Sequence, residues 1–238
     1  MVLRELDGDS VLCIGQPAHA WLSGQLAAAW GNALFPEPRP REEVCLAAAQ
    51  HDLGMAAWDA EPDLNTDTGW PMSFLEMPVE THLRLWTAAP ALALTQSRWV
   101  ALLVSMHGAH LYAGRADEPG VSDVLDYLAA FADAIRASLG VSEDEAARNQ
   151  RLLATWDWMS LVLCRDDLPA TVEAERSLRM ERTGEGTVSV APWPFRADAA
   201  GVSVDARRLE GRFDDREAMR EALRLAPWER VELQLVPG

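Results

Sequence analysis

The sequence predicts a mainly α-helical protein with a small β-sheet, organised as a single domain over residues 1–238. Helix-type periodicity and capping signals dominate residues 16–167, which we expect to form a helical body. Alternation of apolar and polar residues is confined to residues 1–15 and 168–238. If these two ends of the chain pair in one sheet, they form a small α+β part appended to the body rather than a second domain.

The first 15 residues predict a β-hairpin. Residues 2–6 and 11–14 are two short, mostly apolar segments, and Asp7, Gly8 and Asp9 between them form a turn signal.

The next part of the chain predicts two helices and a long loop. Pro17 suits the first turn of a helix that reaches Trp30. Pro40 begins a second helix, which we expect to end at Gly54. Residues 59–75 are rich in proline, glycine and aspartate, so they predict a loop, and long ordered loops are often functional.

Four further helices are predicted before residue 168. Proline and serine mark their starts, and a capping box of Ser142 and Glu145 opens the last one. A proline at position 90 is expected to break the first of them. These helices begin near Pro78, Ser97, Ser122 and Ser142.

The tail predicts strands around one helix. Residues 188–190, 202–204 and 231–235 alternate as strands do, whereas residues 214–225 have a helical pattern.

All 21 basic residues are arginine, and the chain contains no lysine. This excludes phosphate-binding loops of the Walker type, which need a lysine on the nucleotide phosphates. It also excludes Schiff-base enzymes and kinases of the usual protein-kinase kind, because both depend on a lysine.

The net charge of −16 restricts the partners that the chain can bind. It argues against a nucleic-acid polymer and against an anionic membrane surface, because both are held by clustered cations. Three widely separated cysteines and the lack of a hydrophobic leader or a 20-residue apolar run predict a cytoplasmic protein. The expected partner is a small anionic molecule, and the sequence leaves a homo-oligomer open.

A group of histidines and one aspartate carries the functional hypothesis. Asp157 lies in an almost wholly apolar helical stretch, where an unpaired carboxylate costs several kcal/mol, so it must be paired, protonated or bound to a cation. A single histidine on an apolar helix face is more often a core residue than a ligand, but all five are on predicted helices. The histidines are His19, His51, His82, His107 and His110.

The order of these residues along the chain resembles the HD superfamily of metal-dependent phosphohydrolases. A histidine on the first helix is followed by a His-Asp doublet on the second, by histidines on the next two helices and by a late aspartate. The resemblance implies an HD-domain-like helical body with one or two divalent ions of Mn, Fe, Zn, Ni or Co. Neighbouring residues on a helix point about 100° apart, so the doublet can bind one ion only from the helix end. The implied ligands are His19, His51, Asp52, His82, His107 and Asp157.

Asp59, His110 and Arg115 are candidates for catalysis beside the ions, with Arg151 as an alternative to Arg115. Asp59 at the start of the long loop could act as general acid or base, or could simply cap the turn. His110 lies one helical turn after His107 and could be a further ligand or a group that orients one. Without lysine, Arg115 or Arg151 would have to hold a phosphate, although a role as surface charge is slightly favoured for both.

A closer resemblance links the chain to the bacterial DUF3891 family. It rests on residues 30–32, 51–59 and 102–108, which read WGN, HDLGMAAWD and LLVSMHG, and it implies a similar fold but no activity. We therefore expect a metal-dependent phosphohydrolase acting on a small phosphate ester such as a nucleotide. A two-iron oxygenase is an alternative, although Met55 stands where some of those enzymes place a histidine. A non-catalytic metal-binding or ligand-sensing protein is another, so the sequence leaves open whether the chain is an enzyme.

Overall fold

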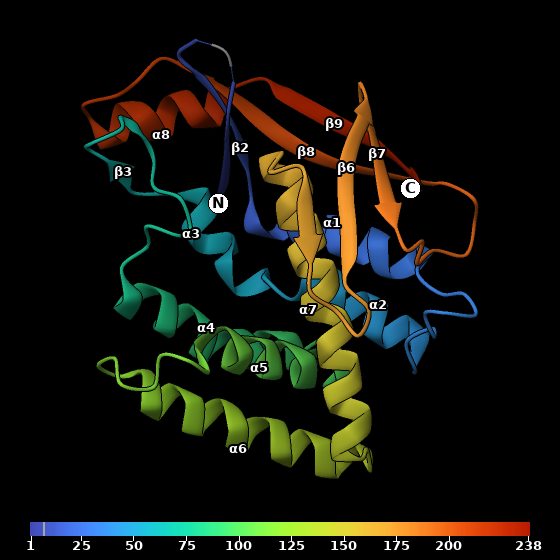
Figure 1. Ribbon diagram of the computed structural model, residues 1–238. Helices are drawn as coiled ribbons and strands as arrows, with labels where there is room; N and C mark the ends of the chain where they lie inside the picture. Colours follow the sequence, from blue (N-terminus) through green and yellow to red (C-terminus); the bar gives the residue numbers. More distant parts are fainter. Residues whose placement is uncertain (7) are drawn as a thin grey trace.

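The computed structural model describes residues 1–6 and 8–238, so Asp7 of the expected N-terminal turn lies outside the described residues. A curled seven-stranded sheet forms one side of the molecule (Figure 1), with strand order β1-β2-β8-β9-β7-β6-β5. Neighbouring strands are antiparallel except β7 and β9, which are parallel. The strands are β1 (Val2–Glu5), β2 (Ser10–Ile14), β5 (Ala170–Val172), β6 (Leu178–Gly184), β7 (Thr187–Ala191), β8 (Ala200–Glu210) and β9 (Trp228–Pro237).

The predicted fold class is wrong in its balance of helix and sheet. About 49% of the chain is helical, and the sheet is large, with seven strands, rather than a small appendage. The N-terminal hairpin does pair with the C-terminal strands, because β2 lies against β8. The sheet is larger than expected because β5 and β6 were not predicted. In β5 only Val172 is buried, and in β6 only Leu178 and Met180 are buried.

Eight α-helices and one 3-10 helix are present among the described residues. Ser97 and Ser142 cap their helices as predicted, each accepting a backbone N–H bond. Gly120, not Ser122, stands at the N-cap of α6, and Pro90 lies inside an unbroken α4. The helices are α1 (Gln16–Ala29), α2 (Arg41–Gln50), η1 (Leu53–Met55), α3 (Ala56–Ala60), α4 (Val79–Leu94), α5 (Arg98–Tyr112), α6 (Val121–Leu139), α7 (Glu143–Arg165) and α8 (Arg216–Leu225).

The predicted long loop is partly structured. Its first residues belong to α3, and β3 (Leu64–Asn65) and β4 (Trp70–Pro71) form a minimal hairpin within it.

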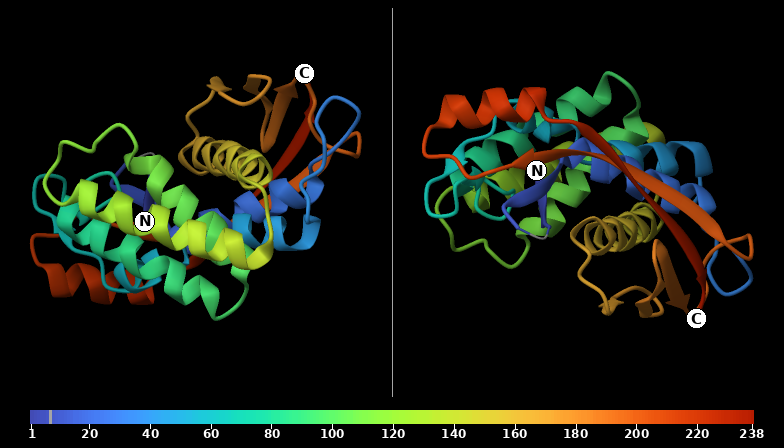
Figure 2. Two further views of the ribbon diagram at one scale, coloured as in Figure 1. Left: turned by 90° about the horizontal axis from the view of Figure 1, so that it is seen from below. Right: turned by 90° about the horizontal axis from the view of Figure 1, so that it is seen from above.

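The sheet curls around the long helix α7 and its neighbour α1 (Figure 2). Helix α1 contacts β8, and α7 contacts β1 and β5. At the other side, α4, α5 and α6 form a helical layer that α7 also reaches (Figure 1). Apolar side chains from both layers join one main core, in which Trp30, Trp86 and Trp156 are fully buried. Throughout the described part of the chain, every helix is too short or too polar to cross a membrane.

Candidate metal centre

Four helical elements converge where α1, α2, α5 and α7 meet. His19 lies on α1, His107 on α5 and Asp157 on α7, while His51 and Asp52 directly follow α2. The first two helices approach closely at Gly24, where an added Cβ atom would lie 2.5 Å from Cβ of Ala49. The absence of a side chain at that position lets His19 and the end of α2 face each other.

Three buried side chains form a cluster that could hold a metal ion. One donor atom each from His19, His51 and Asp157 lies within 4.8 Å of the other two. Oδ1 of Asp157 is 3.2 Å from Nε2 of His51 and 3.7 Å from Nε2 of His19. Atoms that bind one ion at about 2.0–2.2 Å are separated by about 3–4 Å, so these spacings fit a shared ion.

Asp52 faces the same point from the end of α2. Its Oδ2 atom is 2.7 Å from Nε2 of His19 and 3.5 Å from Nε2 of His51. His51 is the C-cap residue of α2, and Asp52 has already left the helical conformation, with φ −102° and ψ 17°. The doublet therefore approaches the cluster from a helix end, as the 100° spacing of neighbouring helical residues requires.

The hydrogen bonds of His51 fix which ring nitrogen faces the cluster. Its Nδ1 atom lies 2.8 Å from the carbonyl oxygen of Ala48, which can only accept, so Nδ1 carries a proton. In the neutral ring Nε2 then has a bare lone pair, and this buried atom has no hydrogen-bond partner among the described residues. It faces the carboxylates of Asp52 and Asp157, so a proton or a cation must lie between them.

His19 is held in the same way by Ser160. The Ser160 hydroxyl donates to the backbone carbonyl of Asp157 at 2.8 Å, so towards Nδ1 of His19, also at 2.8 Å, it can only accept. Nδ1 therefore carries a proton. Nε2 of His19 lies 2.7 Å from Oδ2 of Asp52, so a second proton or a cation must lie between these two atoms. Two imidazole Nε2 atoms thus face two carboxylates in one buried site, a set of donors that could hold a metal ion.

The pKa values show how strongly the site attracts positive charge. Burial alone would lower the pKa of His51, but the carboxylates of Asp52 and Asp157 outweigh it and raise that pKa to about 9. Burial likewise favours neutral carboxyl groups, yet the surrounding histidines hold the pKa of Asp52 and Asp157 below the usual range. In the absence of a metal, a proton takes the place of the cation.

His107 lies at the edge of the cluster. Its Nε2 atom is 3.6 Å from Oδ2 of Asp157, and its Nδ1 atom is 3.4 Å from the side-chain amide of Gln150. Burial lowers the pKa of His107 to about 4, so the ring is neutral and able to bind a cation.

His82 lines the same cavity, but both of its ring nitrogens are engaged. The indole N–H of Trp86 donates to Nε2 at 3.0 Å, and Nδ1 bonds to the Tyr112 hydroxyl. Burial lowers the pKa of His82 to about 4, so the ring is neutral. In this arrangement His82 has no free lone pair, which departs from its expected role as a ligand.

The three expected catalytic residues are placed differently from one another. Asp59 accepts from the backbone N–H of Gln16 at the start of α1, and its Oδ1 atom is 2.6 Å from the amino group of Met1. These contacts tie Asp59 to Met1 and to the start of α1, and it does not line the cavity at the cluster. His110 is exposed and does not line the cavity. Arg115 does line it, and two short bonds of 2.6 and 2.7 Å join its guanidinium to Glu118.

A cavity of about 250 Å³ leads to the cluster. His19, Asp52, His107 and Asp157 contribute to its lining. Tyr112, which no sequence pattern indicated, also lines the cavity. The guanidinium of Arg115 lies over its ring, 4.9 Å from the centroid. Tyr112 is one of only two tyrosines, and no spacing rule could have linked it to His82 on another helix. Gln16 is a further polar lining residue, and the rest of the wall is formed by Phe74, Leu75, Met77, Val79, Trp86, Leu111 and Leu161.

Comparison with known proteins agrees with the second resemblance seen in the sequence. A family model described as a protein of unknown function (DUF3891) matches residues 1–211, which include every residue of the cluster. No curated protein and no solved structure matches the chain. The chain therefore belongs to the DUF3891 family.

Proposed function

We propose that the protein is a metal-dependent phosphohydrolase acting on small phosphate esters. The observation that carries the proposal is the pair of imidazole Nε2 atoms of His19 and His51 that face the carboxylates of Asp52 and Asp157 in one buried site. The order of these four residues resembles the HD phosphohydrolases. Their position at an accessible cavity, instead of a closed core, favours catalysis over a purely structural ion.

We propose one ion held by these four residues, with His107 as a fifth donor. Such a mixed nitrogen and oxygen set suits Mn, Fe, Co, Ni or Zn. Oδ2 of Asp157 faces His107, whereas Oδ1 faces the other histidines. The alternative is therefore a site with two ions, to which Asp157 would contribute both carboxylate oxygens. A bound ion supplies a Lewis acid that polarises a phosphate and lowers the pKa of water.

The cavity walls account for recognition of the phosphate ester. Arg115 is the only arginine among the lining residues that the structure describes, so an anion in the cavity would compete with Glu118 for its guanidinium. Because Trp86 donates to Nε2 of neutral His82, the proton of His82 is on Nδ1 and is donated to the Tyr112 oxygen. The Tyr112 hydroxyl is then free to donate its own proton to a substrate oxygen.

The size of the cavity restricts the substrate. A volume of about 250 Å³ lies just below the range of about 300–1,000 Å³ that is typical of small-molecule sites. The apolar wall of Phe74, Met77 and Leu161 suits the ester's organic group. The oxygenase alternative is not favoured, because Met55 is apolar and 1% exposed and His82 has both ring nitrogens engaged.

The test combines metal analysis with a phosphatase assay. Protein purified without chelator is compared with Asp52→Ala, Asp157→Ala and the control Asp126→Ala, which removes an exposed carboxylate of α6. Wild type and control should contain metal and release phosphate from p-nitrophenyl phosphate with Mn, Fe, Co, Ni or Zn. Both cluster variants should lose metal and activity.

Two results would contradict the proposal at different levels. If the protein binds metal but hydrolyses no phosphate mono- or diester with any of these ions, it is a metal-binding protein and not a phosphohydrolase. No metal above trace in the wild type, even after addition of each ion, would remove the metal centre itself.

A further inference from the structure

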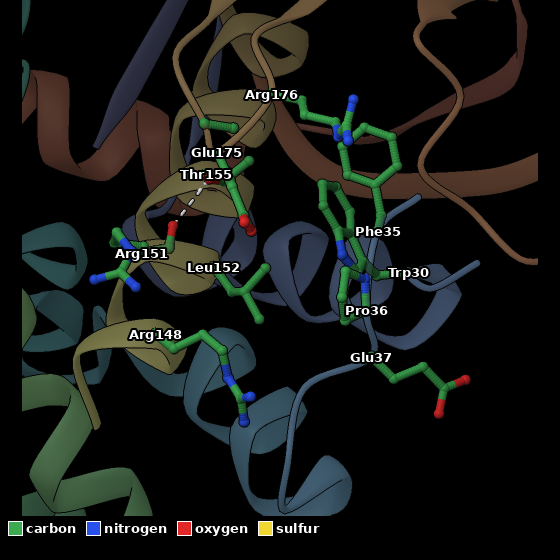
Figure 3. A pocket seen from close by; sticks show the side chains of 11 residues that line it. Trp30, Phe35, Pro36, Glu37, Arg148, Arg151, Leu152, Thr155, Glu175 and Arg176 are labelled. Carbon is green, nitrogen blue, oxygen red and sulfur yellow. Dashed lines mark hydrogen bonds between the residues drawn. The ribbon is translucent and has the colours of Figure 1, made fainter. Parts of the chain in front are cut away.

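A second, smaller pocket lies between the C-terminal end of α1 and helix α7 (Figure 3). It has a volume of about 50 Å³ and shares no lining residue with the metal cavity. In Figure 3, Trp30 and Phe35 form one side, Leu152 of α7 faces them, and Arg148 and Arg176 lie at opposite ends. The pocket is therefore independent of the proposed catalytic site.

Trp30, Phe35 and Leu152 make the inner surface of this pocket mostly apolar. The hydroxyl of Thr155 also lines it but is bonded to the carbonyl of Arg151, and one donor is unsatisfied. Trp30 is 2% exposed and packs edge-on against Phe35 and Trp156, with ring centroids 5.4 and 5.8 Å apart. Its indole nitrogen is buried and has no hydrogen-bond partner within the described chain. A buried N–H group without an acceptor is costly, so a ligand that brings an oxygen atom would relieve it.

The rim of the pocket carries unpaired positive charge. Arg148, Arg151 and Arg176 form no ion pair with any carboxylate in the part of the chain that the structure describes, although most other arginines do. Such a group is unusual in a protein with a net charge of −16, where carboxylates are abundant. Glu37 on the rim is already shared by Arg41 and Arg196, at 3.5 and 3.7 Å.

We propose that this pocket binds a small apolar carboxylate. Guanidinium groups and an indole N–H are all donors, so the ligand must present acceptors and negative charge, and planar carboxylates suit arginine. A volume of about 50 Å³ holds about four water-sized groups, which fits a branched aliphatic chain and is too small for a nucleotide ring system. The aliphatic part packs on Trp30, Phe35 and Leu152.

Glu175 bears on whether the ligand is a simple carboxylic acid or an amino acid. It lines the pocket and forms no ion pair among the described residues. Its carboxylate would repel a simple acid but would pair with the ammonium group of an amino acid. The two probes are therefore 3-methylbutanoate and L-leucine, which share the branched chain and the carboxylate.

The experiment measures binding of both probes to the full chain by calorimetry and ligand-observed NMR. At least one probe should bind, with an affinity in the millimolar range expected for so few atoms. The double variant Arg148→Ala/Arg176→Ala should weaken it at least tenfold, and Trp30→Phe should weaken it several-fold while thermal unfolding shows that the fold persists. Arg84→Ala, which removes an exposed unpaired arginine on α4, should bind as the wild type does.

Two further arms separate the pocket from the metal centre and identify the source. Asp157→Ala should leave probe binding unchanged, because Asp157 does not line this pocket. If the probe carboxylate were instead bound by a metal ion at the cluster, this variant would lose binding. Tighter binding of L-leucine that is abolished by Glu175→Gln would assign an amino acid, and tighter 3-methylbutanoate would assign a simple acid. Failure of both probes to bind, or binding unaffected by the double arginine variant, would overturn the proposal.

Discussion

At the scale of single residues, the proposed metal centre depends on what binds the far side of each imidazole. The carbonyl oxygen of Ala48 accepts a hydrogen bond from Nδ1 of His51, and the hydroxyl oxygen of Ser160 accepts one from Nδ1 of His19. These two contacts turn both Nε2 atoms towards Asp52 and Asp157. Outer contacts of this kind orient metal-binding histidines and raise their basicity.

The raised pKa of His51 predicts that metal binding strengthens as pH rises. A metal must displace the proton that His51 holds up to a pKa of about 9, so affinity should rise about tenfold per pH unit below that value. In the metal-free protein, pH has the opposite effect on stability. Because folding raises the pKa of His51, protonated His51 stabilises the fold fully below its unfolded pKa of 6.5, and this stabilisation is lost as pH rises through about 9.

Thermal unfolding with and without chelator, from pH 6.5 to 9.5, measures both effects. The gain in Tm on adding metal should grow across this window. His110→Ala, which removes an exposed histidine, should show the same profile. A gain that does not change with pH would contradict the assignment of His51 as a ligand.

At the scale of elements, the cluster is built where helices end or cross. The His51–Asp52 doublet lies at the end of α2, and α1 can lie beside it because Gly24 meets Ala49 without a side chain. The long helix α7 brings Asp157 and Ser160 from the other side. Small shifts between these helices therefore move donor atoms relative to one another.

Gly24→Ala should weaken both the fold and the metal site. The new Cβ atom would lie 2.5 Å from Cβ of Ala49 and 3.0 Å from its Cα, so the two helices must separate. Overpacking of this kind costs about 1–3 kcal/mol, and the shift moves His19 away from His51. Denaturant unfolding and metal titration measure the two effects.

Gly114→Ala is the matched control, because an added Cβ atom there meets nothing within 4 Å. If Gly24→Ala retained wild-type stability and metal affinity, the close α1–α2 contact would not position the ligands.

At the scale of the whole molecule, β9 joins two halves of the sheet. It pairs with β8 on one side and with β7 on the other. The family match ends at residue 211, so this central strand follows the matched region. The C-terminal part is thus integral to the fold that surrounds α1 and α7.

Leu235→Ala in β9 should destabilise the entire protein by about 2–5 kcal/mol, because a fully buried leucine is replaced by a cavity. Denaturant unfolding followed by circular dichroism and by tryptophan fluorescence should report the same loss. Glu232→Ala, at an exposed position of the same strand, should change stability by less than about 0.5 kcal/mol. Loss of the sheet signal alone, with the helices intact, would show that the two layers unfold separately.

The local signals of the sequence located most helices but understated the sheet. Ser97 and Ser142 mark real helix starts, because a serine hydroxyl accepts the free backbone N–H groups of the first turn. Strand β5 was missed because it has only three residues, and β6 because Arg179, Glu181 and Arg182 interrupt its apolar pattern. Both strands are stabilised by their neighbours rather than by their own pattern.

The sequence by itself determined the order His19, His51, Asp52, Asp157 and the cost of burying the last carboxylate, and those facts predicted a cation site. Only the tertiary structure decided that His82 has both nitrogens engaged, that Asp59 bonds to the start of α1 and that His110 faces solvent. The physical reason is that periodicity along the chain reports which face of a helix is apolar. Which lone pair faces which carboxylate depends on hydrogen bonds between helices that lie far apart in the sequence.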